Sequence, residues 1–237
     1  MTGVITRLLQ LAVTLFVWRS IFATRPEIQG YTVDEMSAYL VLTALMSILF
    51  SSSHFFRLSD LVRKGTLSAY LVRPYSFLGD SLAVFLGSKV VEVTVIAGAL
   101  LLLRASGAPV LEHASPAVLA LLFSNLLLSF LVGSVVGALS FWLVEMWPIK
   151  PLYASLMALL GGTTFPLDLL PPAIGHVVQA TPFALFGFVN TRALQGALSS
   201  REIAAYLAVS VLWNAACAGL YQLLWRRGLK RYEAVNG

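Results

Sequence analysis

The apolar residues of this chain are gathered into about six long blocks, and short polar or charged segments separate them. Each block is close to the ~20 residues that a helix needs to cross a bilayer core. The blocks cover residues 4–22, 38–56, 82–103, 116–143, 148–165 and 203–225. This pattern predicts an all-α integral membrane protein, with six transmembrane helices in a single domain over residues 1–237.

The first block is the weakest of the six, because Arg7 and Arg19 limit its uncharged part to residues 8–18. As a span, it would need both arginines to reach opposite interfaces with their side chains. A helix that lies flat at the membrane surface is the alternative interpretation.

The region between the last two blocks, residues 166–199, is apolar but irregular. Prolines interrupt it at Pro166, Pro171 and Pro172. Irregular backbone at membrane depth has to be buried in protein or wetted. We therefore expect a re-entrant segment of short helices in the outer leaflet. A seventh span within 182–198 is the alternative, and the polar residues in and near it disfavour it: Gln179, Asn190, Arg192 and Gln195.

Composition leaves little of the chain for a soluble part. Hydrophobic residues make up 58% and charged residues 11%, with a mean hydropathy of +0.83. A soluble domain carries roughly 25% charged residues. The chain therefore has no room for a separate soluble catalytic domain of ordinary size, ~100 residues or more.

The basic residues indicate the orientation in the membrane. An even number of spans puts both termini on one side, and most basic residues then fall on that side. They are Arg7, Arg57, Arg63, Lys64, Arg73, Lys150, Arg226, Arg227, Lys230 and Arg231. The positive-inside rule predicts that this side, with both termini, is cytoplasmic. Because these residues are dispersed and adjoin spans, the net charge of +5 indicates topology and no nucleic-acid partner.

Side chains that could carry catalysis or bind a metal are scattered along the sequence. His54, His113 and His176 lie far apart, and no pair of carboxylates stands at helical spacing within a span. No Gly-rich loop ends in Lys-Ser or Lys-Thr, the pattern of a phosphate-binding loop. The sequence predicts no metal site, no catalytic residue and no cofactor in this chain.

Two features inside the blocks each leave two interpretations open. Lys89 and Glu92 are three residues apart, so they share a helix face and can pair. They line a transport path or gate, or they form an internal ion pair, which we favour. Ser129, Gly133 and Gly137 stand at four-residue spacing, which lets helix backbones approach closely in lipid. This packing face serves contacts within one protomer or across a dimer.

The loop 57–76 is the largest on the basic side, and its first half predicts a short amphipathic helix. Its apolar face carries Leu58, Leu61 and Val62. Asp60 and Lys64 are placed to pair at i,i+4, and Gly65 is expected to end the helix.

The second half of the loop predicts another apolar face, formed by Leu67, Tyr70 and Leu71 and stopped by Pro74. A short amphipathic helix beside a bundle can dock in a groove on a partner protein. A membrane-surface helix without a partner is the alternative.

These residues carry a resemblance to a known family. The loop, with Arg63, Gly65, Leu67, Leu71, Arg73 and Pro74, resembles the loop between the second and third spans of type-2 ABC exporter permeases. Their short, six-span, stand-alone subunits are the most similar. Three further segments are similar to this family: Gly30-Tyr31-Thr32 with Asp34-Glu35-Met36 and Tyr39, Pro166-Leu167 with Pro171-Pro172, and Gly228-Leu229-Lys230-Arg231-Tyr232-Glu233.

The resemblance implies a subunit of an ATP-driven exporter in a bacterial cytoplasmic (inner) membrane, and no enzyme in this chain. Two permease subunits, identical or similar, would form the path for an unknown exported substrate. ATP and Mg would belong to separate P-loop ATPase subunits. The residues that would couple to them are Arg57, Asp60, Arg63, Lys64, Gly65, Leu67, Leu71, Arg73 and Pro74.

The sequence departs from the family at its start, because such permeases usually have a longer cytoplasmic elbow helix before the first span. About six residues precede Arg7, which leaves open whether the elbow contacts the ATPase or the chain starts earlier. Two other classes remain as alternatives: a non-transporting anchoring subunit and a membrane-embedded lipid-modifying enzyme. The apolar interior, with Asn125 and Asn214, mildly favours an amphipathic or lipid-like cargo.

Overall fold

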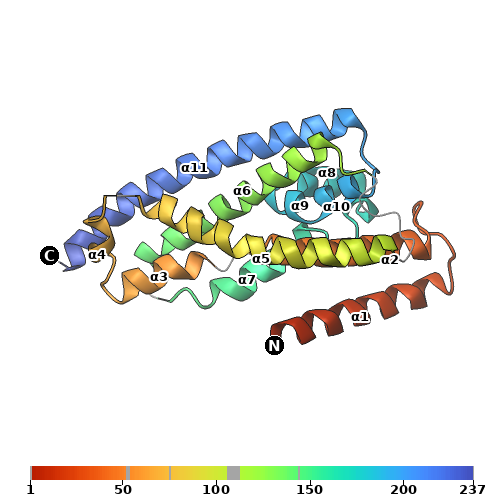
Figure 1. The fold of residues 1–237 in the computed structure, drawn as a ribbon, viewed down its shortest axis with the longest axis horizontal. Helices are drawn as coiled ribbons and strands as arrows, with labels where there is room; N and C mark the ends of the chain where they lie inside the picture. The colour runs from red at the N-terminus through yellow and green to blue at the C-terminus, as the bar shows by residue number, and fades with distance from the viewer. Residues whose placement is uncertain (1, 52–53, 75, 106–112, 144, 237) are drawn as a thin grey trace.

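A computed structural model of the chain describes residues 2–51, 54–74, 76–105, 113–143 and 145–236 (Figure 1). An isolated bridge between Ile28 and Tyr31 is the one β pairing in these ranges, and the rest is helices and loops. In chain order the helices are α1 Thr2–Phe22, α2 Val33–Leu49, α3 Phe55–Arg63, α4 Ser68–Leu71, α5 Phe77–Ala105, α6 Pro116–Ala138, η1 Leu139–Phe141, α7 Ile149–Leu160, η2 Leu167–Leu169, α8 Pro172–Gln179, α9 Pro182–Phe186, α10 Phe188–Leu194 and α11 Ser200–Asn236.

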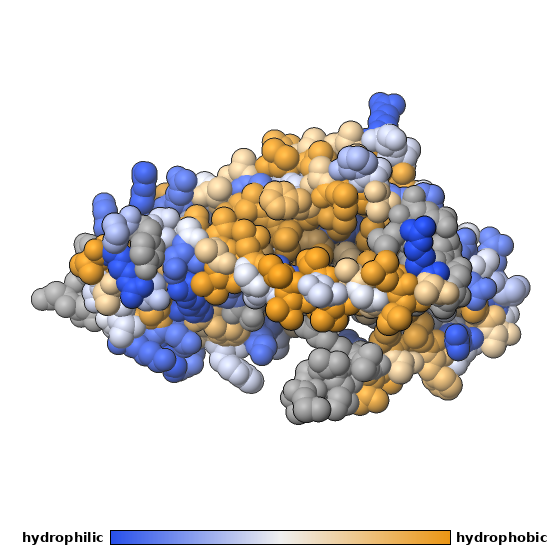
Figure 2. Space-filling model, in the orientation of Figure 1, coloured by the Kyte–Doolittle hydropathy of each residue, from blue (hydrophilic) through white to orange (hydrophobic). Residues whose placement is uncertain are grey.

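The long helices run along one axis and separate two different ends of the molecule (Figure 1). At one end lie α3, α4 and the C-terminus, and at the other lie α8, α9 and α10. Figure 2 shows apolar residues over the middle of the visible face and hydrophilic residues gathered towards both ends. This distribution is the one expected of a protein whose middle lies in hydrocarbon.

Three helical stretches are long and apolar enough to span a membrane: Phe77–Leu102, Pro116–Phe141 and Ser200–Tyr232. A fourth candidate is a broken one, because Pro172–Gln179 and Pro182–Leu194 pass the same test together but are bent by 74°. The structure therefore defines an all-helical membrane protein with three to four candidate spans. The expected count of six stays a prediction.

Two of the predicted spans form helices that are shorter than their apolar blocks. The block 38–56 is divided, because α2 ends at Leu49 and α3 begins at Phe55. The block 148–165 is helical only as far as Leu160, after which Gly162 adopts a left-handed conformation with φ +70°. A helix of 12 residues, as α7 is, covers about 18 Å and does not cross a ~30 Å core alone.

The start of α2 lies before its apolar block because the local sequence caps it. The Thr32 side chain accepts a hydrogen bond from the Glu35 backbone N–H, and the Glu35 carboxylate accepts one from the Thr32 N–H. This capping box satisfies two of the free N–H groups at the helix start. The hydrogen bonds that the Thr32 N–H and hydroxyl donate to the Glu35 carboxylate lower the pKa of that group.

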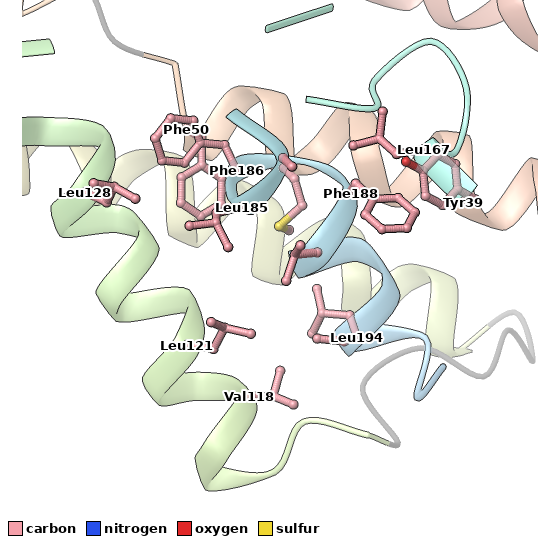
Figure 3. Packing of buried hydrophobic residues seen from close by; sticks show 14 of the residues in the cluster. Tyr39, Phe50, Val118, Leu121, Leu128, Leu167, Leu185, Phe186, Phe188 and Leu194 are labelled. Carbon is pink, nitrogen blue, oxygen red and sulfur yellow. The ribbon is translucent and has the colours of Figure 1, made fainter. Parts of the chain in front are cut away.

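The main core fills the half of the molecule that contains the short helices. Leu128 of α6 faces Leu185 and Phe186 of α9, and Leu121 faces Leu194 of α10 (Figure 3). Phe50, just after α2, stacks on Phe186 with ring centroids 5.7 Å apart. Burying a side chain of this size stabilises the fold by about 1.5–3 kcal/mol. The short helices α9 and α10 are therefore held by packing and not by their own length.

The contact between Gly187 and the end of α7 gives a first testable prediction. A Cβ at Gly187 would lie well under 3.0 Å from the Gly161 carbonyl oxygen, and backbone atoms cannot rotate away. Gly187→Ala is expected to cost about 1–3 kcal/mol through overpacking. Thermal unfolding of the purified protein measures this as a lower midpoint.

Gly175→Ala in α8 is the matched control, since its Cβ would have no neighbour closer than 3.5 Å. It should unfold like the unchanged protein. Equal midpoints for the two variants would show that α7 and α9 do not pack this closely.

Candidate functional site

The end of the molecule that carries α3 and α4 holds the loop singled out in the sequence. α3 ends at Arg63, and Gly65, the residue expected to end it, follows the C-cap with φ +68°. The Gly65 N–H donates to Val62 O at 3.1 Å, and the Thr66 N–H donates to Leu61 O at 3.0 Å. These two bonds form a Schellman motif, in which glycine accepts positive φ without steric cost.

The ion pair on α3 differs from the one expected. Asp60 Oδ1 lies 3.5 Å from Arg63 Nη2, at i,i+3, and the expected partner Lys64 is not used. Lys64 is the C-cap residue, where the chain leaves the helix, whereas Arg63 is still in the last turn. Both side chains of the observed pair are largely exposed, so the pair contributes little to stability.

The inner face of the loop is packed firmly onto the bundle. Leu58 of α3 and Leu67, just before α4, are buried in one cluster with Phe77 of α5. The same cluster includes Phe141, Tyr221 and Tyr232 from η1 and α11. Of the second predicted apolar face, Leu67 is fully buried, whereas Leu71 is 41% exposed.

Arg57 holds the two halves of the loop to the membrane helix that follows. Its guanidinium forms an ion pair with Asp80 in the first turn of α5 and donates to the Tyr70 hydroxyl at 3.2 Å. It also lies 5.6 Å from the Tyr70 ring centroid and 5.7 Å from that of Phe77. Arg57 therefore connects α3 to Tyr70 of α4 and to Asp80 of α5 inside the protein. Sequence reasoning missed Asp80, because nothing near it in the chain points to a partner 23 residues earlier.

The outer face of the loop presents a compact mixed surface. Val72 is 85% exposed, and the Arg73 guanidinium lies over the Tyr70 ring at 4.3 Å from its centroid. We call eight of the exposed residues the loop face: Asp60, Arg63, Lys64, Gly65, Leu71, Val72, Arg73 and Pro74. Of the nine residues predicted to couple, Arg57 and Leu67 face inward and the other seven belong to the loop face. Tyr75 and the two serines before His54 lie outside the described residues.

His54, at the start of α3, enters a socket on α6. Its ring stacks on Phe130 and meets Phe85 edge-on, each at 5.0 Å between centroids. Nε2 lies 3.0 Å from the Phe130 carbonyl, and because a carbonyl only accepts, Nε2–H is the donor. A Cβ at Gly133 would lie 2.7 Å from Nε2, so only glycine leaves room for the ring.

The small-residue face of α6 is thus used inside the protomer. Gly137 faces the backbone of Phe55, whose oxygen would lie 3.1 Å from a Cβ at that position. Ser129 is fully buried, and its hydroxyl donates to Leu126 O at 2.8 Å. Gly133 and Gly137 leave room for the segment between α2 and α3 to pack closely on α6. This agrees with the interpretation that the small-residue face serves contacts within one protomer.

Lys89 connects α5 to the same junction. The expected pair is present, with Lys89 Nζ 2.6 Å from Glu92 Oε2. Nζ also donates to Ser51 O at 3.0 Å, a carbonyl just past the end of α2. Ser51 stands just past the C-cap residue Phe50, near the negative end of the α2 dipole, which favours a cation. Lys89 is only 4% exposed, so it acts as a buried C-terminal cap for α2.

The paired charges predict a large effect of removing one partner. Lys89→Met is expected to destabilise the protein by about 3 kcal/mol, because it leaves Ser51 O and the Glu92 carboxylate without their cation. Lys89→Met with Glu92→Met should recover more than half of that loss. Unfolding midpoints in one detergent measure both, and equal stability of Lys89→Met and the unchanged protein would contradict the capping role.

At the opposite end, Asp168 of η2 joins the region 166–199 to the segment before α2. The Tyr31 hydroxyl donates to Asp168 Oδ2 at 2.8 Å, and Arg192 Nη2 of α10 lies 3.6 Å from the same oxygen. Burial and the bond to Asp168 raise the pKa of Tyr31, so the phenol keeps its proton and donates it. The Tyr39 hydroxyl ties α2 to Gly162 O at 2.6 Å.

The three prolines of the region predicted to be re-entrant stand at helix starts. Pro166 precedes η2, Pro171 precedes α8, and Pro172 is the first residue of α8. Proline is favoured there because its missing N–H would have no helical partner. In the described ranges, no three or more His, Cys, Asp or Glu side chains gather in a way that could hold a metal ion.

Comparison with known proteins identifies the family. The family model of the ABC-2 family transporter proteins matches residues 8–236, nearly the whole chain. The chain therefore belongs to this family, and it is a type-2 ABC permease. No curated protein matches the chain. The family is a membrane-embedded transport component that works with an ATPase partner, so this chain is a multi-pass membrane permease of an ABC transport system.

Proposed function

We propose that this permease exports its substrate as a dimer, with an identical or similar second subunit, and is driven by separate P-loop ATPases. The ATPases bind at the end that carries α3 and α4, which makes that end and both termini cytoplasmic. ATP and Mg bind to those partner chains. The membrane is a bacterial inner membrane.

The observation that carries the proposal is that the loop between α2 and α5 has a firmly packed inner side and an exposed outer side. A coupling element has to be rigid to transmit a push, and it has to present a surface to its partner. The loop meets both needs, because Arg57 and Leu67 hold its inner side while Val72 and Arg73 stand outside. The Gly65 cap turns the chain between the two halves.

The loop face suggests how it is recognised. Arg63, Lys64 and Arg73 surround an exposed apolar edge formed by Leu71 and Val72. Such an edge fits an apolar groove with acidic residues at its rim, as in the helix-in-groove mode of recognition. We propose this groove on the ATPase.

A movement of α3 has two physical routes into the membrane helices. His54, at its start, would press on Phe130 and Gly133 of α6. The Ser51 carbonyl, three residues before His54, would pull on Lys89 of α5. Because α5 and α6 are both candidate spans, a push at the loop face can change their relative position.

The cargo is proposed only as a class. The interior asparagines bond within the chain: Asn125 Nδ2 donates to Asn190 Oδ1 at 2.8 Å, and Asn214 Nδ2 donates to Ser124 O at 3.1 Å. The donor groups of both amides are used internally, whereas their Oδ1 atoms are buried without a hydrogen-bond partner in the described ranges. An amphipathic or lipid-like cargo that needs few polar contacts fits this interior better than a simple ion.

Purification of the tagged protein from its native membranes in mild detergent tests the proposal. We expect a P-loop ATPase in stoichiometric amount by mass spectrometry, with vanadate-sensitive ATP hydrolysis. A lone permease without ATPase, in a detergent that preserves other ABC complexes, would contradict it.

A further inference from the structure

Helix α11 has two different sides along its whole length. Cys217, Tyr221, Gly228 and Tyr232 are buried against the bundle. The opposite side carries exposed apolar residues within the candidate span, among them Leu212, Leu220 and Leu223. In a membrane this exposed stripe is available to lipid.

The exposed stripe continues directly into basic residues. At 100° per residue, Leu212, Leu223, Arg227 and Lys230 lie within about 60° of one another around the helix axis. Arg226 and Arg231 flank them, at about 40° and 100° from Leu212. All four basic side chains are exposed, and Phe141 packs on Gly228 on the other side.

The basic residues stand at the depth of the lipid headgroups. Residues 203–225 contain no charged side chain and, as a helix, measure about 35 Å, against a hydrocarbon core of ~30 Å. The stretch from Arg226 to Arg231 then falls within about 9 Å beyond the core. Among the side chains that the structure describes, no ion pair uses any of the four.

We propose that Arg226, Arg227, Lys230 and Arg231 form a binding site for the phosphate groups of anionic lipids. Arginine matches a phosphate with two parallel hydrogen bonds, and a cluster of four basic residues next to a span is typical of such sites. The acyl chains of the bound lipid lie along the apolar stripe above the site, beside Leu220 and Leu223. The site belongs to the lipid-facing side of α11 and is separate from the loop face.

Native mass spectrometry of the purified full-length protein tests this site. The protein is mixed with phosphatidylglycerol and phosphatidylcholine at equal concentration, and the bound lipids are counted. We expect a preference of about tenfold or more for the anionic lipid. A variant with all four residues changed to glutamine should lose the preference, whereas Arg201→Gln, at the other end of α11, should keep it. A variant with Arg227→Lys and Arg231→Lys keeps the charge and should retain most of the binding.

Two results would contradict the proposed lipid site. One is equal binding of the two lipids by the unchanged protein, and the other is an undiminished preference for the anionic lipid in the glutamine variant. Inorganic phosphate is added as a competitor to separate a lipid site from a free-anion site. Displacement of the lipid by millimolar phosphate would assign the residues to free phosphate. Undiminished lipid binding in a glutamine variant that no longer holds the ATPase would assign them to the protein partner.

Discussion

Replacing Gly65 by valine is expected to reduce transport severely and to leave the permease in the membrane. Nothing lies within 4 Å of a Cβ at this position, so the effect comes from the backbone and not from a clash. With φ +68°, a side chain costs about 1–2 kcal/mol, and a β-branched one more. The turn would relax by moving Arg63 relative to Val72, so the residues of the loop face before and after position 65 would no longer form one surface. Transport into inverted vesicles should fall at least tenfold.

Two control variants separate the effect of the positive φ at Gly65 from the effect of adding a side chain. Gly65→Asn should keep a large part of the activity, because asparagine tolerates the left-handed region. Gly98→Ala in α5 adds a Cβ in equally open space without positive φ and should transport normally. Normal transport by Gly65→Val would show that the loop is not the coupling element.

The second large effect is expected at Gly133. In Gly133→Ala, the new methyl would lie 2.7 Å from His54 Nε2, and the ring is held between Phe85 and Phe130. Overpacking of this kind costs about 1–3 kcal/mol, and the bond to Phe130 O would be lost as well. We expect a lower unfolding midpoint together with weaker coupling of ATP hydrolysis to transport.

A double-mutant cycle isolates the contact. His54→Ala with Gly133→Ala removes the ring and fills part of its space, so it should be more stable than the sum of the single changes predicts. Transport should stay low, because His54 is the proposed route from α3 to α6. Strict additivity of the two changes would contradict the direct packing of the His54 ring on Gly133.

The sequence predicts the helical class and the family well because both depend on patterns within short windows. The apolar stretch of α11 and the Gly65 turn follow directly from local composition. The break between α2 and α3 does not, since the block 38–56 contains neither glycine nor proline. Its backbone is partly satisfied by Lys89, 38 residues away, and no local pattern contains that contact.

The candidate site was predictable in position but not in orientation. Helical spacing puts Leu67 and Leu71 on one face, yet α4 has only four residues, and one of these leucines is buried while the other is exposed. The orientation of the Arg57 side chain depends on its ion pair with Asp80, a residue of the later helix α5. The role of Gly133 depends on a histidine 79 positions earlier, and its spacing with Gly137 indicates close packing without naming the partner.

Cross-linking from Val72 is the most direct test of the central claim, which is that the loop face contacts the ATPase. Cys217 is the one cysteine, so Cys217→Ser gives a background in which a single thiol can be placed. Val72→Cys is compared with Val177→Cys, a residue of α8 that is 69% exposed at the opposite end. We predict that a short thiol-reactive cross-linker joins a P-loop ATPase, identified by mass spectrometry, to position 72 and not to position 177. No ATPase adduct at 72, or an equal one at 177, would contradict the assignment.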